Sequence, residues 1–161
     1  MGESSNRSGK IGEEKAKRLL HRMGWMNLLE GHGIKCFRSS HITDKGSKKQ
    51  SHGIDFLYAM NNPFHDNRTD VIVVSVKHTI GIYPNSDQQI KKAFGSYLED
   101  LQQTLECSER DSGVQSYIDS SAPKKNKELV GLLFWLQSDN EKFNFQNMKQ
   151  KLQNAEISSD I

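Results

Sequence analysis

The chain has 161 residues, 34% of them hydrophobic, and a mean hydropathy of −0.74, which fits one domain with a polar surface and a core of its own. No stretch approaches the ~18 consecutive apolar residues of a transmembrane helix, and residues 1–10 lack the apolar core of a signal peptide. The formal net charge is only +2, so bulk charge neither requires nor excludes a nucleic-acid partner. Composition therefore argues against a membrane protein and a wholly disordered chain.

The two cysteines, Cys36 and Cys107, have neither the spacing of a metal-binding motif nor the number needed for a disulfide framework. Free thiols are typical of a reducing compartment. We therefore expect a cytoplasmic protein without membrane contact, and the sequence predicts no metal site at the cysteines.

The N-terminal half is predicted to form one helix and three strands. Residues 1–8 are polar and are expected to be flexible. The helix that follows ends at Gly24, a residue type that often follows the last turn. Its apolar positions recur at spacings of three and four: Ala16, Leu19, Leu20 and Met23.

Three strands are expected next, because their residues alternate in polarity or are β-branched. They cover residues 33–38, 54–58 and 70–76. Residues 39–50 are polar and lysine-rich, which is typical of a loop.

The C-terminal half adds a helix and a strand. The helix begins after an N-cap at Ser86 or Asp87, and residues 108–127 are expected to form a surface loop. Residues 129–136 are almost all apolar, which predicts a strand buried on both faces. The helix is expected to pack on the sheet, and the predicted core positions are Phe94, Leu98, Leu101, Leu132, Leu133 and Phe134.

Asp55 and Lys77 are the charged residues that stand out, because each lies within or at the end of an apolar strand. An antiparallel hairpin centred on His65 would place Asp55 opposite Ser75. Side chains alternate along a strand, so Lys77 would share the face of Ser75. The three residues are therefore expected to converge, although a strand-end aspartate or lysine taken alone often has only a structural role.

Glu13 is a further candidate on the first helix. At ~100° per residue it lies roughly 70° from the centre of the apolar stripe, whereas Glu14 lies about 170° away. Glu13 can therefore face the sheet. Glu14 is expected to face solvent and to pair with Arg18.

These residues resemble the PD-(D/E)XK nuclease superfamily, in particular its restriction-endonuclease-like and Holliday-junction-resolvase-like members. The resemblance covers residues 9–136 and predicts an α/β fold with an αβββαβ core, in which helices flank a mixed central sheet. The nuclease-like domain would span residues 9–137, and residues 138–161 would form a helical or loose tail. The matching positions are Gly12-Glu13, Ala16, Leu20, Gly24-Trp25, Gly53-Ile54-Asp55 and Ser75-Val76-Lys77.

The resemblance implies a catalytic site of Glu13, Asp55, Ser75 and Lys77. Mg²⁺ or Mn²⁺ would be held by Asp55, Glu13 and the carbonyl of Val76, because these ions prefer oxygen ligands. The family usually has a second carboxylate where this chain has Ser75. Glu99 or Asp44 is a candidate for a carboxylate that has moved elsewhere.

The implied activity is metal-dependent hydrolysis of DNA phosphodiester bonds. The Ser-Val-Lys pattern after a Gly-Ile-Asp strand also resembles the nuclease subunits of two-gene anti-phage defence systems, which implies a second subunit; a homodimer is the other assembly expected. Two alternatives stay open: an inactive nuclease fold that binds DNA or a partner, and a purely structural adaptor. Candidate nucleic-acid contacts are Lys48, Lys49, Gln88, Gln89 and Lys91.

Overall fold

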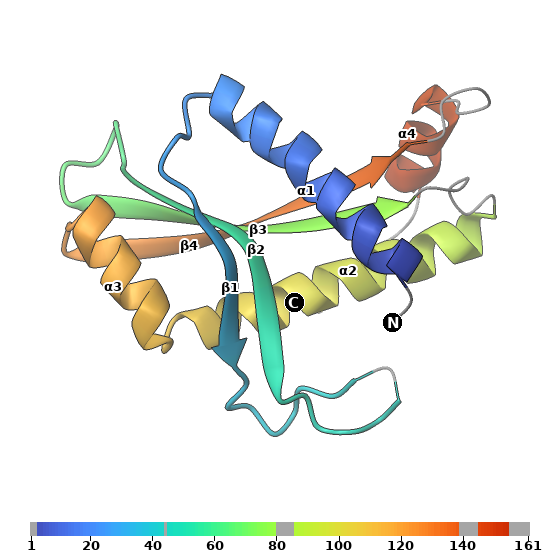
Figure 1. The fold of residues 1–161 in the computed structure, drawn as a ribbon, viewed down its shortest axis with the longest axis horizontal. Coiled ribbons are helices and arrows are strands. Elements are labelled where there is room, and N and C mark those ends of the chain that lie inside the picture. The colour runs from blue at the N-terminus through green and yellow to red at the C-terminus, as the bar shows by residue number, and fades with distance from the viewer. Residues whose placement is uncertain (1–2, 44, 80–85, 139–144, 155–161) are drawn as a thin grey trace.

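The computed structural model describes residues 3–43, 45–79, 86–138 and 145–154 (Figure 1). Within these ranges no helix is long and apolar enough to cross a membrane. The elements, in chain order, are α1 (Glu3–Arg22), β1 (Leu29–Lys35), β2 (Ser51–Asn61), β3 (Arg68–Thr79), α2 (Asp87–Ser108), α3 (Ser112–Ser121), β4 (Asn126–Gln137) and α4 (Phe145–Asn154).

The four strands form one mixed sheet in the order β1-β2-β3-β4. The pairs β1–β2 and β2–β3 are antiparallel, whereas β4 runs parallel to β3 and is reached through α2 and α3. This arrangement confirms the predicted αβββαβ core and mixed sheet, with α3 as an additional helix before β4.

The sheet divides where β2 and β3 separate, a point that we call the fork. The β2–β3 pairing runs from Asn61 opposite Thr69 to Phe56 opposite Val74, which confirms the register predicted for a hairpin centred on His65. Beyond the fork, β2 stays paired with β1 and β3 stays paired with β4. Figure 1 shows the result: β1 and β2 run down the view while β3 and β4 run across it.

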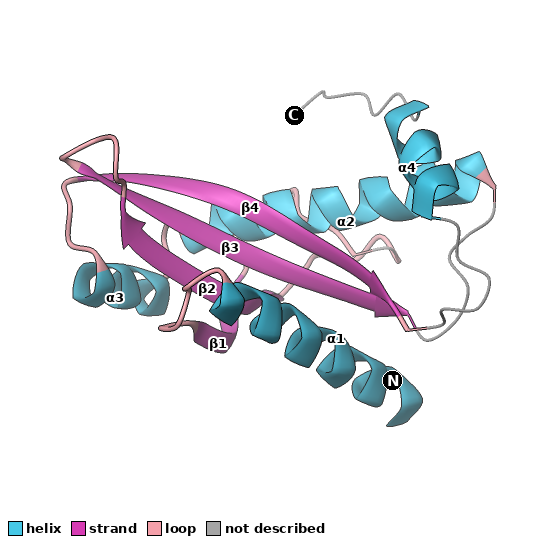
Figure 2. Ribbon diagram, turned by 90° about the horizontal axis from the view of Figure 1, so that it is seen from above, coloured by secondary structure: helices cyan, strands magenta, loops and turns pink. Residues whose placement is uncertain are grey.

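Helices cover both faces of the sheet, and Figure 2 shows α1 and α2 on opposite sides of β3 and β4. On the α1 side, Ala16 and Leu20 pack with Phe56, Ile72 and Val74. The larger core on the other side joins the sheet to α2 and α3 and includes Leu57, Val71, Val73, Leu101, Val114 and Ile118. The sheet is therefore the central layer, and the fork lies between the helices.

The first helix differs from its prediction at both ends. It begins at Glu3, so residues 3–8, expected to be flexible, are helical, and the Ser8 hydroxyl lies 2.9 Å from His78 Nδ1. Near its other end Leu19 and Met23 are exposed, because the buried face is the narrower row that includes Gly12, Ala16 and Leu20. A Cβ on Gly12 would lie 2.4 Å from His78 Cβ, so only glycine permits this approach.

The helix α3 replaces much of the loop expected over residues 108–127. The Asp111 side chain caps it by accepting a hydrogen bond from the Val114 amide at 2.9 Å. Val114 and Ile118, one turn apart, are fully buried against the sheet. The helix was missed because a run of polar residues hides this two-residue apolar face.

The last strand is not buried on both faces, as its apolar sequence had suggested. β4 is an edge strand, and Val130 on it is 46% exposed. Of the six predicted core residues only Leu101 is buried; the others, Phe94, Leu98, Leu132, Leu133 and Phe134, are partly exposed. A long apolar run reports contact with helices on either side, but it does not reveal an open edge.

Replacing Leu101 by alanine is expected to lower the free energy of unfolding by about 2–5 kcal/mol, because the side chain fills the space above Gly131 in the larger core. Leu19→Ala is the matched control, since Leu19 is 46% exposed, and should change stability by less than about 0.5 kcal/mol. Chemical denaturation measures both. Equal effects for the two variants would contradict the packing of α2 on β4.

Candidate active site

Asp55 lies at the fork. It is the first residue of β2 beyond the pairs formed with β3, and its side chain is half-buried. Its Oδ2 accepts a hydrogen bond from the backbone N–H of Val76 at 2.6 Å. The carboxylate therefore takes the place that a β2 backbone carbonyl would occupy if the strands stayed paired.

Lys77 lies on the other arm of the fork and points toward α2. Its Nζ is 2.9 Å from Asp100 Oδ2 and 5.7 Å from the ring centre of Tyr97. The ammonium is also close enough to Asp55 to favour the ionised form of that carboxylate and lower its pKa. Lys77 is thus ion-paired with Asp100 on α2 and acts on Asp55 through its charge.

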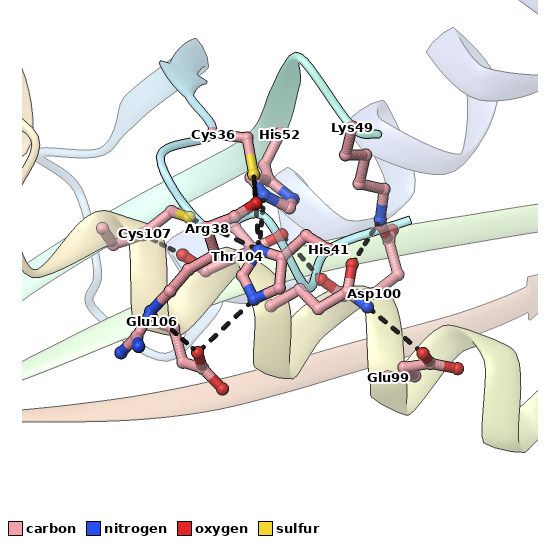
Figure 3. Close-up of polar contacts among 12 residues, drawn as sticks. Cys36, Arg38, His41, Lys49, His52, Glu99, Asp100, Thr104, Glu106 and Cys107 are labelled. Atoms are coloured by element: carbon pink, nitrogen blue, oxygen red, sulfur yellow. Dashed lines mark hydrogen bonds and ion pairs between the residues drawn. The ribbon is translucent and has the colours of Figure 1, made fainter. Parts of the chain in front are cut away.

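Asp100 is at the centre of a charged network that the sequence did not predict (Figure 3). Its other oxygen, Oδ1, is 2.7 Å from the Nζ of Lys49, which also donates to Gln103 at 2.9 Å. Burial alone would raise the Asp100 pKa, but hydrogen bonds from Lys49 and Lys77, together with their charges, hold it below its ordinary value. No sequence signal separates Asp100 from its neighbour Glu99, because only the folded loop brings Lys49 to it.

Glu13 approaches the fork from α1. Its side chain is exposed, yet partial burial and the negative charge of Asp55 raise its pKa, despite the opposing effect of Lys10. The pKa of Asp55 is raised as well, first by burial; Lys77 and the Val76 N–H oppose this only in part, and Asp100 adds to it. Burial, together with the charge of Asp55 on Glu13, therefore disfavours the ionised carboxylates, and a bound cation would stabilise them.

A cleft of ≈ 560 Å³ opens beside Lys77 and Asp100. One wall is the loop before β2 and the other is the middle of α2. Its lining residues are Ile42, Thr43, Gly46, Lys49, Lys77, Ser96, Tyr97, Glu99, Asp100 and Gln103. Glu99 is thus at the cleft, whereas the other candidate carboxylate, Asp44, lies outside the described residues.

The structure gathers some of the predicted site residues and separates others. Glu13 and Lys77 each interact electrostatically with Asp55, and Ser75 is buried one residue from Val76. Lys48 is exposed, near the cleft wall but not lining it. The remaining candidate contacts, Gln88, Gln89 and Lys91, are exposed at the start of α2.

The start of α2 is distant from the charged network. Gln88 precedes Asp100 by twelve residues, or roughly 18 Å of helix. Gln88 and Gln89 therefore do not take part in the site around Lys77.

Among models of protein families, the one described as the GAPS4 protein PD-(D/E)XK nuclease domain matches residues 1–161. The chain belongs to this family. The superfamily predicted from the sequence is confirmed, and GAPS4 is an anti-phage defence protein. No curated protein and no solved structure matches the chain significantly.

Membership of the GAPS4 nuclease family implies a divalent metal, and the carboxylates at the fork fit one. Asp55 and Glu13 supply the hard oxygen atoms that Mg²⁺ prefers, and burial, the main cause of their raised pKa values, disfavours their ionised forms unless a cation binds. Asp100 is instead balanced by two lysines. The better metal candidates are therefore Asp55 and Glu13.

Replacing Asp55 by asparagine is expected to leave thermal stability unchanged or to raise it in metal-free buffer. Because the pKa of Asp55 is raised in the folded state, its ionised form costs stability once the pH rises above the pKa of this group in the unfolded chain. Asparagine removes that charge, and its Oδ1 can still accept the hydrogen bond from the Val76 N–H. Differential scanning fluorimetry at neutral pH provides the measurement.

The same experiment with Mn²⁺ tests the metal site. At a Mn²⁺ concentration 100 times the dissociation constant, the free energy of unfolding of the unaltered chain should rise by about 2.7 kcal/mol. That of Asp55→Asn should rise much less. An equal gain in both proteins would show that the ion binds elsewhere.

Proposed function

We propose that the chain is a metal-dependent endonuclease that hydrolyses DNA in anti-phage defence. The observation that carries the proposal is the position of Asp55 at the fork, with Val76 and Lys77 on one side and Glu13 on the other. Membership of the GAPS4 nuclease family supports the reaction class.

Asp55, Glu13 and the carbonyl of Val76 would hold Mg²⁺ or Mn²⁺. When bound, such an ion polarises a phosphate oxygen and lowers the pKa of a water molecule. Asp55 is already oriented for this role by the hydrogen bond from the Val76 N–H, which fixes one oxygen and leaves the other available. Glu13 would orient a water molecule from the α1 side.

Lys77 would stabilise the negative charge that develops on the phosphate. Asp100 holds its ammonium at 2.9 Å, so Asp100 acts as a positioning residue for Lys77. Lys49, on the other oxygen of Asp100, keeps the carboxylate from neutralising Lys77 completely. Because Ser75 stands where the family usually has a second carboxylate, β3 itself supplies no acidic neighbour for Lys77. In this proposal Asp100 supplies that neighbour from α2 instead.

DNA is the proposed substrate. Lys48 and Lys49 come from the loop that forms one wall of the cleft, where they can contact a phosphate backbone. A second subunit is part of the same proposal. Leu19, Met23 and Met26 expose apolar side chains at the end of α1 and just after it, which supports a protein contact there.

The proposal is tested by incubating the chain, with its expected partner subunit where one is required, with plasmid and linear DNA and Mg²⁺ or Mn²⁺. Asp55→Ala should abolish cleavage, and Lys77→Met should slow it by about 10²–10³-fold, because Lys77 is assigned to the developing charge. Lys125→Met removes one exposed lysine just before β4, at the end of the sheet away from the fork, and as a matched control should leave the rate close to that of the unaltered chain. Cleavage that persists in Asp55→Ala would contradict the proposal.

Ser75 favours a second candidate, an inactive nuclease fold that binds DNA or a partner protein. In that case neither metal should promote cleavage, and Mn²⁺ should leave the thermal stability unchanged. Ser75→Asp sharpens the distinction: a working site should bind Mn²⁺ more tightly with the added carboxylate, whereas a site without metal should only lose stability through repulsion from Asp55.

A further inference from the structure

A second group of metal-binding side chains lies behind the cleft wall. Cys36 follows β1, His41 is in the loop, His52 is near the start of β2, and Cys107 is in the last turn of α2 (Figure 3). Their sulfur and nitrogen atoms all lie within 4.8 Å of one another. All four side chains are buried, with exposures of 1–5%.

The distances among these atoms match the edges of a tetrahedron around zinc. His41 Nδ1 is 3.2 Å from His52 Nε2, 3.4 Å from Cys36 Sγ and 3.6 Å from Cys107 Sγ. Zinc bonds of about 2.3 Å to sulfur and 2.0–2.1 Å to nitrogen give edges of about 3.3 Å between two nitrogens and about 3.6 Å between nitrogen and sulfur. The three distances from His41 Nδ1 therefore have the lengths expected of a tetrahedral zinc site, and the other three distances are each at most 4.8 Å.

Hydrogen bonding alone does not explain these contacts. An imidazole nitrogen has either one proton or one lone pair in the ring plane, so His41 Nδ1 can form only one good hydrogen bond. It nevertheless has three heteroatoms within 3.6 Å. A cation between the four atoms would satisfy all of them at once.

The surroundings of the group also suit a metal. The other nitrogen of His41, Nε2, lies 3.4 Å from Glu106, which favours a proton on Nε2 and leaves Nδ1 free to bind. Nδ1 of His52 lacks such a partner among the described residues.

We propose that Cys36, His41, His52 and Cys107 bind one Zn²⁺ as a closed structural site. Two thiolates and two imidazoles select zinc over Mg²⁺ and Mn²⁺, which prefer oxygen. Four protein ligands leave no position for water or substrate, so the site has no direct part in hydrolysis. The proposal departs from the sequence-based expectation that the cysteines carry no metal site. The spacing is irregular because the ligands come from the loop between β1 and β2, from β2 and from α2.

The zinc site would fix the cleft wall. His41 anchors the loop between β1 and β2, and Lys49 in that loop reaches Asp100, two turns before Cys107 on α2. One ion would thus tie the loop to both the β1–β2 arm and α2. The inference is independent of the nuclease proposal, because these ligands are distinct from Asp55 and Glu13.

The direct test is the metal content of the untagged chain, purified without added metal or chelator and measured by mass spectrometry. One zinc per chain is expected, and exchange for Co²⁺ should give the intense visible bands of tetrahedral cobalt and a thiolate-to-cobalt charge-transfer band. No bound zinc, together with a cobalt spectrum lacking these bands, would overturn the proposal, as would a Cys36–Cys107 disulfide in the purified chain.

Two variants check the assignment. Cys107→Ser should lose zinc, whereas Ser108→Ala, which alters the adjacent buried residue, should keep it. Asp55→Asn should also keep its zinc, so failure of the nuclease proposal would leave this result unaffected. If Cys107→Ser does not fold, cobalt titration of the unaltered chain still decides the question.

Discussion

The hydrogen bond from the Val76 N–H to the Asp55 carboxylate is the contact on which the proposed site depends. It forms because β2 and β3 part after Phe56 and Val74, which leaves backbone groups of β3 without their usual strand partner. A backbone N–H that is partly buried needs an acceptor, and here the acceptor is the charged carboxylate of Asp55. The same contact thus stabilises the divided sheet and orients the carboxylate that is proposed to bind metal.

Charge around the fork is distributed unevenly, and this distribution separates the roles of the acidic residues. Asp100 is balanced by Lys49 and Lys77, so its pKa is lowered, whereas the pKa values of Asp55 and Glu13 are raised. Burying carboxylates whose charge is not fully compensated costs stability, and such a cost is typical of functional sites. The soft sulfur and nitrogen ligands are gathered elsewhere, so the two proposed metals would not compete for one site.

Features set by neighbouring residues could be predicted from the sequence, and features set by distant ones could not. The hairpin register followed from the apolar patterns around His65, and the Glu14–Arg18 pair followed from helical spacing. Asp100 acquires its partners only when the loop carrying Lys49 folds onto α2. Likewise, Cys107 meets Cys36 only in the folded chain, across 71 positions of sequence.

The most direct test of the central claim is a crystal structure of the chain grown with Mn²⁺, with anomalous diffraction recorded at the manganese and zinc absorption edges. The account predicts a manganese peak coordinated by Asp55 at the fork, on the side facing Glu13, and a separate zinc peak among Cys36, His41, His52 and Cys107. A manganese ion bound away from Asp55, or no manganese at the fork when the ion is in large excess, would contradict it.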